Sequence, residues 1–159
     1  MAFTFHPLAI RDVVLVRPTR HVDDRGVFTE TYRRDAFHEA GLPSDFVQDN
    51  LVRSVQGVLR GLHYQLPPVA QGKLVGVVSG RIYDVAVDLR RGGPTYGRWV
   101  AHRLVVETGA VRWIPPGFAH GYCVLSETAD VMYKVSAPYI GELNRGIRWN
   151  DPSLGMPWP

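Results

Sequence analysis

The stretch Val58–Gly80 reads VLRGLHYQLPPVAQGKLVGVVSG and consists of two apolar, strand-like runs joined by a proline-containing connection. Arg60, His63, Gln65 and Lys73 lie among its leucines and valines. Side chains of these types bind anions and transfer protons, and burying one of them without a partner is costly. A solvated sheet edge would explain Arg60 alone, but the whole cluster indicates a functional site.

Strand alternation predicts which of these side chains share a face. It separates two sets, with Leu59, Gly61, His63 and Gln65 on one face and Arg60, Leu62 and Tyr64 on the other. A glycine inside a strand often marks a bulge or a close approach of two backbones. We therefore expect Gly61 to allow Arg60 and His63 to serve one cavity.

A second polar stretch, Gly109–Val124, reads GAVRWIPPGFAHGYCV. Together the two stretches resemble the paired motifs of the cupin family. The first cupin motif is His-x-His followed by a Glu and then a Gly, and the matching residues here are His63, Gln65, Lys73 and Gly80. The second is a Pro-x-Gly turn followed by a His, matched here by Pro115-Pro116-Gly117 and His120. The resemblance implies a cupin barrel.

The residue types in the first motif depart from those of a metal-binding cupin. Such a site needs several neutral imidazoles and a carboxylate. Gln65 takes the place of one imidazole, and Lys73 takes the place of the carboxylate. An ammonium group among the ligands would repel a divalent cation, so we expect no metal. A metal bound by His63 and His120 alone stays as the alternative.

Length and composition fit one globular domain over residues 1–159. The chain is 45% hydrophobic and 21% charged, with a formal net charge of only +3. It has no basic tail, which disfavours nucleic acid as a partner. A small anionic molecule held by a few arginines fits the charge as well.

Cysteine usage and hydropathy indicate the compartment. Cys123 is the only cysteine, so no internal disulfide can form, and a reducing compartment is indicated. No apolar run approaches the roughly 18 residues of a membrane span. Met1–Arg11 has no signal-peptide layout. We expect a cytoplasmic protein with no membrane partner.

Many short strands with Gly and Pro turns predict an all-β sandwich or barrel. The expected strands are Leu8–Pro18, Val27–Arg33, Phe46–Arg53, the two runs of Val58–Gly80, Arg81–Leu89, Trp99–Glu107, Val111–Pro115, Ala119–Leu125 and Val131–Val135. Arg34–Ala40 is the best candidate for a helix, because Gly41-Leu42-Pro43 ends it. The predicted fold is an all-β cupin jelly-roll barrel with a short helix after the second strand.

Motifs along nearly the whole chain resemble the dTDP-4-dehydrorhamnose 3,5-epimerase family. They run in order and at family spacing from Asp24-Arg25-Gly26 to Trp158-Pro159. Between these ends lie Phe28-x-Glu30, Phe46–Asn50, Val58–Gln65, Gln71–Val75, Asp84–Asp88, Pro94–Gly97, Ile114–Tyr122, Tyr133-Lys134 and Trp149–Pro152. Each motif alone is weak evidence for the family, whereas the whole set in this order is strong evidence. The set is weaker evidence for a particular substrate.

The resemblance implies a jelly-roll cupin homodimer that acts on a nucleoside-diphospho-4-keto-6-deoxy sugar. The ketone at C4 acidifies the protons on C3 and C5. A base removes one of them, the enolate is stabilised, and an acid returns a proton on the opposite face. This chemistry requires neither a redox cofactor nor a metal, so no cofactor is expected.

The resemblance also assigns catalytic roles. His63 matches the family's base, and an imidazole with its ordinary pKa suits proton transfer at neutral pH. Lys73 would place positive charge beside the enolate oxygen. Tyr133 matches the proton donor, although a core tyrosine with a bonded hydroxyl is the ordinary alternative.

Binding positions follow one at a time from the same resemblance. Arg25 and Arg60 match residues that hold the diphosphate, as guanidinium groups do well. The other matches are Gln48 and Asn50 at the nucleotide, Phe28 and Glu30 in the same site, His120 beside the sugar, and Tyr139 stacked on the base. The family further implies that a strand around Val27–Arg33 crosses to the partner subunit, so that Arg25, Phe28 and Glu30 complete the neighbouring site.

Two departures from the family bear on the site. Family members usually continue past the Trp-Pro pair with an aspartate that orients the catalytic histidine and a lysine near the nucleotide, whereas this sequence ends at Pro159. We therefore expect Asp84 to hold His63, with a structural hydrogen bond as the alternative. The family has a glutamate near the nucleotide base, and this position is Asn144 here, with Glu142 two residues earlier. The sequence therefore does not determine which nucleotide base is bound.

The sequence leaves three alternatives to a 3,5-epimerase. One is an epimerase that acts at a single carbon or on another nucleotide sugar. The second is a non-catalytic cupin that binds a nucleotide sugar, which the combination of His63, Lys73 and Tyr133 disfavours. The third is a metal-dependent cupin enzyme, which Gln65 and Lys73 disfavour.

Overall fold

The computed structural model describes residues 1–159, and most of its regular structure is β-sheet. The strands are β1 (Phe3–Pro7), β2 (Val14–Pro18), β3 (Arg20–Asp23), β4 (Gly26–Thr29), β5 (Gln48–Val55), β6 (Leu59–Gln65), β7 (Lys73–Ser79), β8 (Arg81–Asp88), β9 (Trp99–Val105), β10 (Val111–Ile114), β11 (Phe118–Val124), β12 (Thr128–Val135) and β13 (Asn144–Gly146). The helices are α1 (Arg34–Glu39) and two 3-10 turns, η1 (Val106–Thr108) and η2 (Gly141–Leu143). None of them has the length and hydropathy that a membrane-spanning helix needs.

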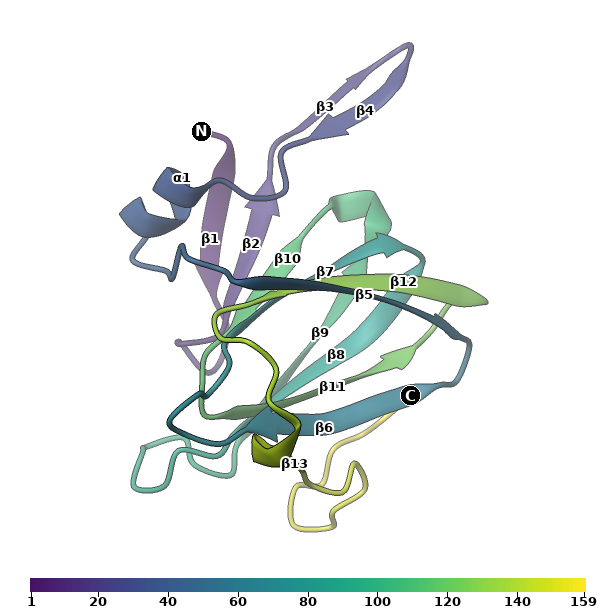
Figure 1. Cartoon of the computed structure of the whole chain (residues 1–159). Coiled ribbons are helices and arrows are strands. Elements are labelled where there is room, and N and C mark those ends of the chain that lie inside the picture. Colours follow the sequence, from purple (N-terminus) through teal and green to yellow (C-terminus); the bar gives the residue numbers. More distant parts are fainter.

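Two antiparallel sheets face each other and form the barrel seen in Figure 1. The six-stranded sheet has the order β1-β2-β10-β7-β12-β5, and the five-stranded sheet has the order β13-β6-β11-β8-β9. Neighbouring strands such as β10 and β7, or β6 and β11, are far apart in the sequence. This is the all-β jelly-roll barrel that the sequence predicts.

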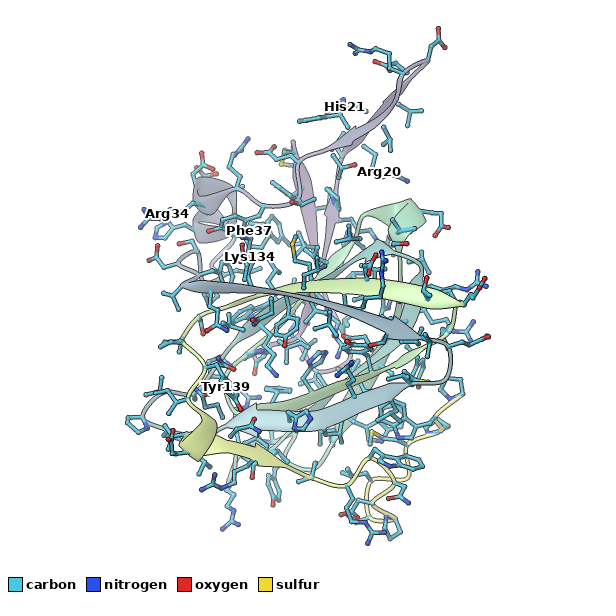
Figure 2. All side chains as sticks on the ribbon, turned by 45° about the vertical axis from the view of Figure 1, so that its right-hand side comes forward. Arg20, His21, Arg34, Phe37, Lys134 and Tyr139 are labelled. Atoms are coloured by element: carbon cyan, nitrogen blue, oxygen red, sulfur yellow. The ribbon has the colours of Figure 1, made fainter.

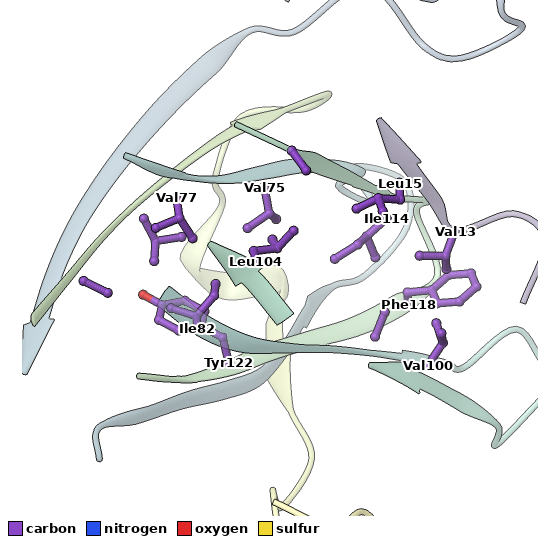
Figure 3. Close-up of a cluster of buried hydrophobic side chains, with 14 of the residues drawn as sticks. Val13, Leu15, Val75, Val77, Ile82, Val100, Leu104, Ile114, Phe118 and Tyr122 are labelled. Carbon is purple, nitrogen blue, oxygen red and sulfur yellow. The ribbon is translucent and has the colours of Figure 1, made fainter. Parts of the chain in front are cut away.

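Alternate residues of both sheets fill the inside of the barrel with aliphatic and aromatic side chains (Figure 3). On β8, Ile82 and Ala86 belong to this interior core, whereas Val85 and Val87 pack on the outer face of the same sheet. Because side chains alternate along a strand, Asp84 shares the inner face with Ile82 and Ala86. The residue pattern that builds the core therefore also carries polar groups into the barrel.

The predicted helix Arg34–Ala40 is confirmed to within one residue as α1. Phe37 is its buried side chain, and its ring meets that of Phe3 edge-on at a centroid distance of 5.5 Å. The helix follows the fourth strand instead of the second, because the sequence did not predict β1 or β3. The predicted strand Val27–Arg33 is shorter than expected, since β4 ends at Thr29.

Strands β3 and β4 form a separate two-stranded hairpin that projects from the body of the barrel (Figure 1). Its apolar side chains are open, with Val22 76% and Phe28 70% exposed. A narrow groove of about 320 Å³ lies where the hairpin meets the outer face of the six-stranded sheet, and Val27, Val78 and Met132 are among the residues that line it. The hairpin thus has little contact of its own with the barrel interior.

Candidate active site

A cavity of about 670 Å³ opens between the two sheets. Eight of the predicted site residues line it: Gln48, Asn50, Arg60, His63, Lys73, His120, Tyr133 and Tyr139. They come from β5, β6, β7, β11 and β12 and from the loop before η2. Residues separated by up to about ninety positions in the chain therefore meet at one place, because the jelly-roll crossovers bring these strands together.

The predicted bulge at Gly61 is confirmed. His63 pairs with His120 and Arg60 pairs with Tyr122, so two residues of β6 oppose the single Gly121 of β11. Gly61 has φ +123°, and a Cβ atom there would lie 2.6 Å from the Cα of Gly121. Only glycine fits this close approach. The bulge turns Arg60 into the cavity together with His63, where its Nε donates to Ser54 Oγ at 2.9 Å.

Histidine and tyrosine side chains face this cavity from opposite sheets. His63 lies on β6 of the five-stranded sheet, whereas Lys73 and Tyr133 lie on β7 and β12 of the six-stranded sheet. The Lys73 ammonium lies 6.0 Å from the centre of the Tyr133 ring. A molecule held between the sheets would therefore have an imidazole on one side and an ammonium with a phenol on the other.

Burial sets the protonation of these three groups. It lowers the pKa of Lys73 to about 8, and the Asp84 carboxylate acts in the opposite direction. Burial and the positive charge of Lys73 lower the pKa of His63 below its ordinary value. Burial raises the pKa of Tyr133, although Arg60 opposes that shift. At neutral pH the site therefore holds a neutral imidazole, a mostly charged lysine and a protonated phenol.

The expectation that Asp84 holds His63 is corrected by the structure. Asp84 is fully buried, and its Oδ1 lies 2.6 Å from Nε2 of His120. His63 makes no hydrogen bond through its side chain and forms no ion pair with Asp84. The reason is the register, which sets Asp84 opposite Tyr122 and so brings it diagonally to His120 on the same inner face.

The loop that carries Tyr139 is fixed by two glutamines. Gln48 Oε1 accepts the Tyr139 N–H at 3.0 Å, and Gln65 Oε1 accepts the Ile140 N–H at 2.9 Å. Gln65 is buried and also donates to the Pro138 carbonyl at 3.0 Å. Gln65 thus supports the wall of the cavity without lining it, and this is a structural reason for an amide at the position where a metal cupin has a histidine.

Arg25, Phe28 and Glu30 are not brought to the cavity of their own chain. Arg25 and Phe28 lie on the projecting hairpin, where Arg25 pairs with Asp23 at 2.6 Å. Glu30 follows β4 and lies 3.7 Å from Arg33. Figure 2 shows the hairpin residues Arg20 and His21 well apart from Tyr139, which marks the cavity.

Sequence reasoning did not single out several residues of the cavity. Tyr122, Gln71, Val52 and Leu59 also line it. Strand alternation gives a signal for Tyr122, because it lies two residues after His120 on one face of β11. Asn144, which was noted only as a departure from the family pattern, also lines the cavity. No three His, Cys, Asp or Glu side chains are grouped so as to hold a metal ion.

The fold and the cavity together define a cupin-like barrel whose working groups are acid–base side chains. A family model for dTDP-4-dehydrorhamnose 3,5-epimerase matches residues 7–159. The chain is 56% identical to the dTDP-4-dehydrorhamnose 3,5-epimerase of Pseudomonas aeruginosa over 153 residues, which cover 96% of this chain and 84% of that protein. The chain therefore belongs to the dTDP-4-dehydrorhamnose 3,5-epimerase family, a family of isomerases, as the sequence motifs predict.

Two further proteins are similar to this chain. The crystal structure of dTDP-6-deoxy-D-glucose-3,5-epimerase from Legionella pneumophila in complex with dTDP-4-keto-L-rhamnose is 44% identical, with a TM-score of 0.95 over 99% of this chain and 84% of that one. This likeness confirms the predicted cupin-like jelly roll. A dTDP-4-dehydrorhamnose 3-epimerase from Streptomyces niveus is 40% identical over 96% of this chain and 74% of that protein.

Proposed function

We propose that the protein epimerises a nucleoside-diphospho-4-keto-6-deoxy sugar at C3 and C5, with dTDP-4-dehydro-6-deoxyglucose as the model substrate. One observation carries the proposal: His63 faces the cavity from one sheet, while Lys73 and Tyr133 face it from the other. Inversion of a carbon requires a base on one side of the sugar ring and an acid on the opposite side. The two walls supply these groups.

In the proposed reaction, Nε2 or Nδ1 of neutral His63 takes the proton from the carbon next to the C4 ketone. The electron pair of the broken C–H bond forms the enolate. The Lys73 ammonium stabilises the developing negative charge on the C4 oxygen. The Tyr133 hydroxyl then gives a proton to the carbon from the opposite face, which inverts the centre. Loss of the second acidic proton repeats the sequence at the other carbon.

Arg60 supports the choice of a diphosphate-linked substrate. Arg60 lines the cavity, and its one side-chain hydrogen bond, from Nε to Ser54, leaves both Nη groups available to a ligand. Planar guanidinium groups bind phosphate oxygens with two parallel hydrogen bonds. The Legionella relative was crystallised with a dTDP sugar, which supports the same ligand class here. We further propose that Gln48, Asn50 and Tyr139 contact the nucleotide, and that His120 contacts the sugar.

The direct test is incubation with dTDP-4-keto-6-deoxyglucose in D₂O, followed by NMR to locate deuterium. Label at both C3 and C5 supports double epimerisation. The absence of deuterium label with saturating protein would contradict the proposal. It would instead favour a non-catalytic protein that binds a nucleotide sugar. The same assay after dialysis against EDTA tests the prediction that no metal is required, since a metal-dependent cupin enzyme would lose activity.

Epimerisation at one carbon is the second candidate. The chain is 40% identical to a protein of Streptomyces niveus that is named for action at C3 alone, which supports this candidate less strongly than the 56% identity to a 3,5-epimerase supports the first. Label at C3 alone would support this candidate.

We also propose that the protein is a homodimer in which the hairpin reaches the partner subunit. The exposed Val22 and Phe28 support this arrangement, since large apolar side chains on a projecting hairpin are costly in water. In the partner's site, Arg25 would bind the diphosphate, and Phe28 and Glu30 would complete the wall. Sedimentation that found an active monomer at micromolar concentration would rule the homodimer out.

Single-domain organisation over residues 1–159 and a cytoplasmic location complete the proposal. The interior core draws residues from both sheets, which supports one folding unit. The lone cysteine, Cys123, is buried and forms no disulfide, which supports a reducing compartment. Localisation of a tagged protein by fractionation tests the second point.

A further inference from the structure

Arg112 is a fully buried arginine that the reaction described above does not use. It lies on β10 of the six-stranded sheet, with no exposed side-chain surface. Its guanidinium crosses the barrel to the five-stranded sheet, where Nη1 donates to the Asp84 carbonyl at 2.8 Å and Nη2 donates to the Val100 carbonyl at 3.2 Å. Burying a charge in this way is costly unless the charge is paired.

The ion-pair partner of Arg112 is the carboxylate of Asp84. Nε of Arg112 lies 3.2 Å from Asp84 Oδ2, within ion-pair distance, although its N–H does not point directly at the oxygen. The other oxygen, Oδ1, lies 2.6 Å from Nε2 of His120. A continuous line of contacts therefore runs from the guanidinium through the carboxylate to a ring that lines the cavity.

We propose that Arg112 is a positioning residue for the reaction: by fixing the Asp84 carboxylate, it holds His120 with the proton on Nε2 and with Nδ1 open to the cavity. This inference deepens the proposed function, because it assigns to His120 a role toward the same sugar substrate. Arg112 itself touches no substrate.

Hydrogen-bond chemistry fixes the tautomer. An ionised carboxylate only accepts hydrogen bonds, so Nε2 of His120 must carry the proton that it shares with Asp84. Nδ1 of His120 has no hydrogen-bond partner in the chain, and it is not among the enclosed polar atoms that lack one. Nδ1 is therefore accessible from the cavity. A neutral His120 presents an acceptor there, which fits a hydroxyl group of the sugar ring, whereas the ketone oxygen needs a donor.

The charges around Asp84 fit this assignment. Burial alone would raise the pKa of Asp84, but Arg112, His120 and Lys73 outweigh it and hold that pKa below the ordinary value. Burial lowers the pKa of His120 despite the attraction of Asp84, and Lys73 and Arg112 act in the same direction as burial. The remaining titratable neighbours are Tyr122, which pairs with Asp84 on β11, and His102, which pairs with it on β9. The carboxylate is thus kept as an acceptor and His120 as a neutral ring.

The alternative role for Arg112 is purely structural, as a hydrogen-bonded link between the two sheets. The substitution Asp84→Asn distinguishes this structural role from the positioning role. An amide has one oxygen, and the guanidinium of Arg112 offers only donors, so the oxygen should turn toward Arg112. The amide NH₂ then faces His120, which must accept on Nε2 and move its proton to Nδ1. Long-range correlation NMR of protein with ¹⁵N-labelled histidine distinguishes the two tautomers of His120.

We expect the Nε2–H tautomer in the wild type, the Nδ1–H tautomer in Asp84→Asn, and return of the Nε2–H tautomer in the double variant Asp84→Asn/Arg112→Met. In the double variant the amide is free to turn its oxygen back to His120. The same tautomer in Asp84→Asn with and without Arg112 would overturn the proposal. These spectra need no substrate, so they give an answer even where the proposed epimerase activity is wrong.

Kinetics supply the second readout. In Arg112→Met, kcat should fall on the order of 10²-fold, the loss that misplacement of a group by about 1 Å can cause. The affinity for dTDP should stay within about twofold, because Arg112 does not reach the ligand. Phe37→Ala is the matched control, since Phe37 is also almost fully buried but packs in a separate cluster on the outer face of the six-stranded sheet. It should lower the melting temperature without changing kcat or the His120 tautomer.

A measurement on the wild-type protein covers the case in which the variants do not fold. The ¹³C shift of the Asp84 carboxyl should report an ionised group below the ordinary aspartate pKa of about 3.9, for as long as the protein stays folded. An Asp84 that takes up a proton at or above that value would overturn the proposal, because a protonated carboxyl would not fix the proton on Nε2 of His120.

Discussion

The ammonium of Lys73 lies 6.0 Å from the ring centre of Tyr133, and both side chains face His63 across one cavity. The two residues reach this position from adjacent strands, because Lys73 pairs with Val135 and Tyr133 pairs with Val75 in the register of β7 and β12. They are therefore diagonal neighbours on the inner face of the same sheet. The group that stabilises the enolate and the group that returns the proton thus share one wall, opposite the base.

The substitution His63→Ala tests the base. It should abolish both deuterium exchange and epimerisation, with a loss of about 10²–10⁴-fold or more, because alanine leaves no base at this position. Affinity for dTDP, measured by calorimetry, should stay near that of the wild type. His38→Ala, on the exposed end of α1, is a control that should keep full activity. Exchange at the wild-type rate in His63→Ala would refute the assignment.

The substitution Tyr133→Phe tests the acid separately from the base. Proton abstraction by His63 should continue, but the proton should return to the face from which it came. Deuterium exchange should therefore outlast inversion, and the two NMR signals should separate by about 10²-fold or more. Tyr64→Phe on the same strand as His63 is the control, since Tyr64 packs on the outer face of the sheet. Equal loss of exchange and inversion in Tyr133→Phe would show that the tyrosine does more than donate the proton.

The pH dependence of kcat/KM should be bell-shaped. His63 must be neutral, and its pKa is lowered by burial and by Lys73, so the acidic limb should fall below pH 6.5. Lys73 must be charged, and burial lowers its pKa to about 8, so activity should be lost as the pH rises through about 8. Tyr133 has a raised pKa and should not contribute in this range.

The variant Lys73→Arg identifies the group behind the alkaline limb. Arginine stays charged throughout, so the limb near pH 8 should vanish even though the rate falls from the changed geometry. An unchanged alkaline limb in Lys73→Arg would assign that limb to a different group.

The substitution Gly61→Ala tests the bulge that joins Arg60 to His63. The new Cβ would lie 2.6 Å from Gly121 Cα and 2.7 Å from the His120 carbonyl oxygen, so the β6–β11 pair must separate. Gly26→Ala is a matched control, since Gly26 has φ +132° with nothing near its Cβ position. Both carry backbone strain, and Gly61→Ala should cost roughly 1–3 kcal/mol more in unfolding free energy. Equal costs by urea denaturation would mean that the close approach is unimportant.

The barrel was predictable from sequence because strand alternation and turn residues repeat along most of the chain. Strand β1 was missed, although Phe3–His6 alternates apolar and polar residues, because Pro7 ends this pattern after four residues. The length of β4 was overestimated because β-forming residues continue to Tyr32, whereas Tyr32 leaves the sheet to pack against Phe37. Local propensity cannot show where tertiary packing ends a strand.

The site was predictable where a single strand determines it and was not where register between strands determines it. Gly61 indicated the bulge because a glycine inside a strand often marks one. The partner of Asp84 depends on how β8 pairs with β11, which no stretch of sequence specifies alone. The burial of Arg112 was hidden for a related reason, since arginine is normally exposed unless it is paired, and its pair lies on a different sheet.

Mixing two inactive variants tests whether the hairpin completes the partner's site. If it crosses, each site combines the barrel of one chain with the hairpin of the other. A His63→Ala chain has an intact hairpin, and an Arg25→Ala chain has an intact barrel, so a mixed dimer has one complete site. Random pairing makes half of the dimers mixed, so the unfractionated mixture should regain about one quarter of the wild-type activity and the purified mixed dimers about one half. Co-expression with two different tags, followed by tandem purification and the D₂O assay, measures this. If activity stays at the level of the separate variants although mixed dimers form, each hairpin serves its own chain, and Arg25 does not bind the substrate of the partner.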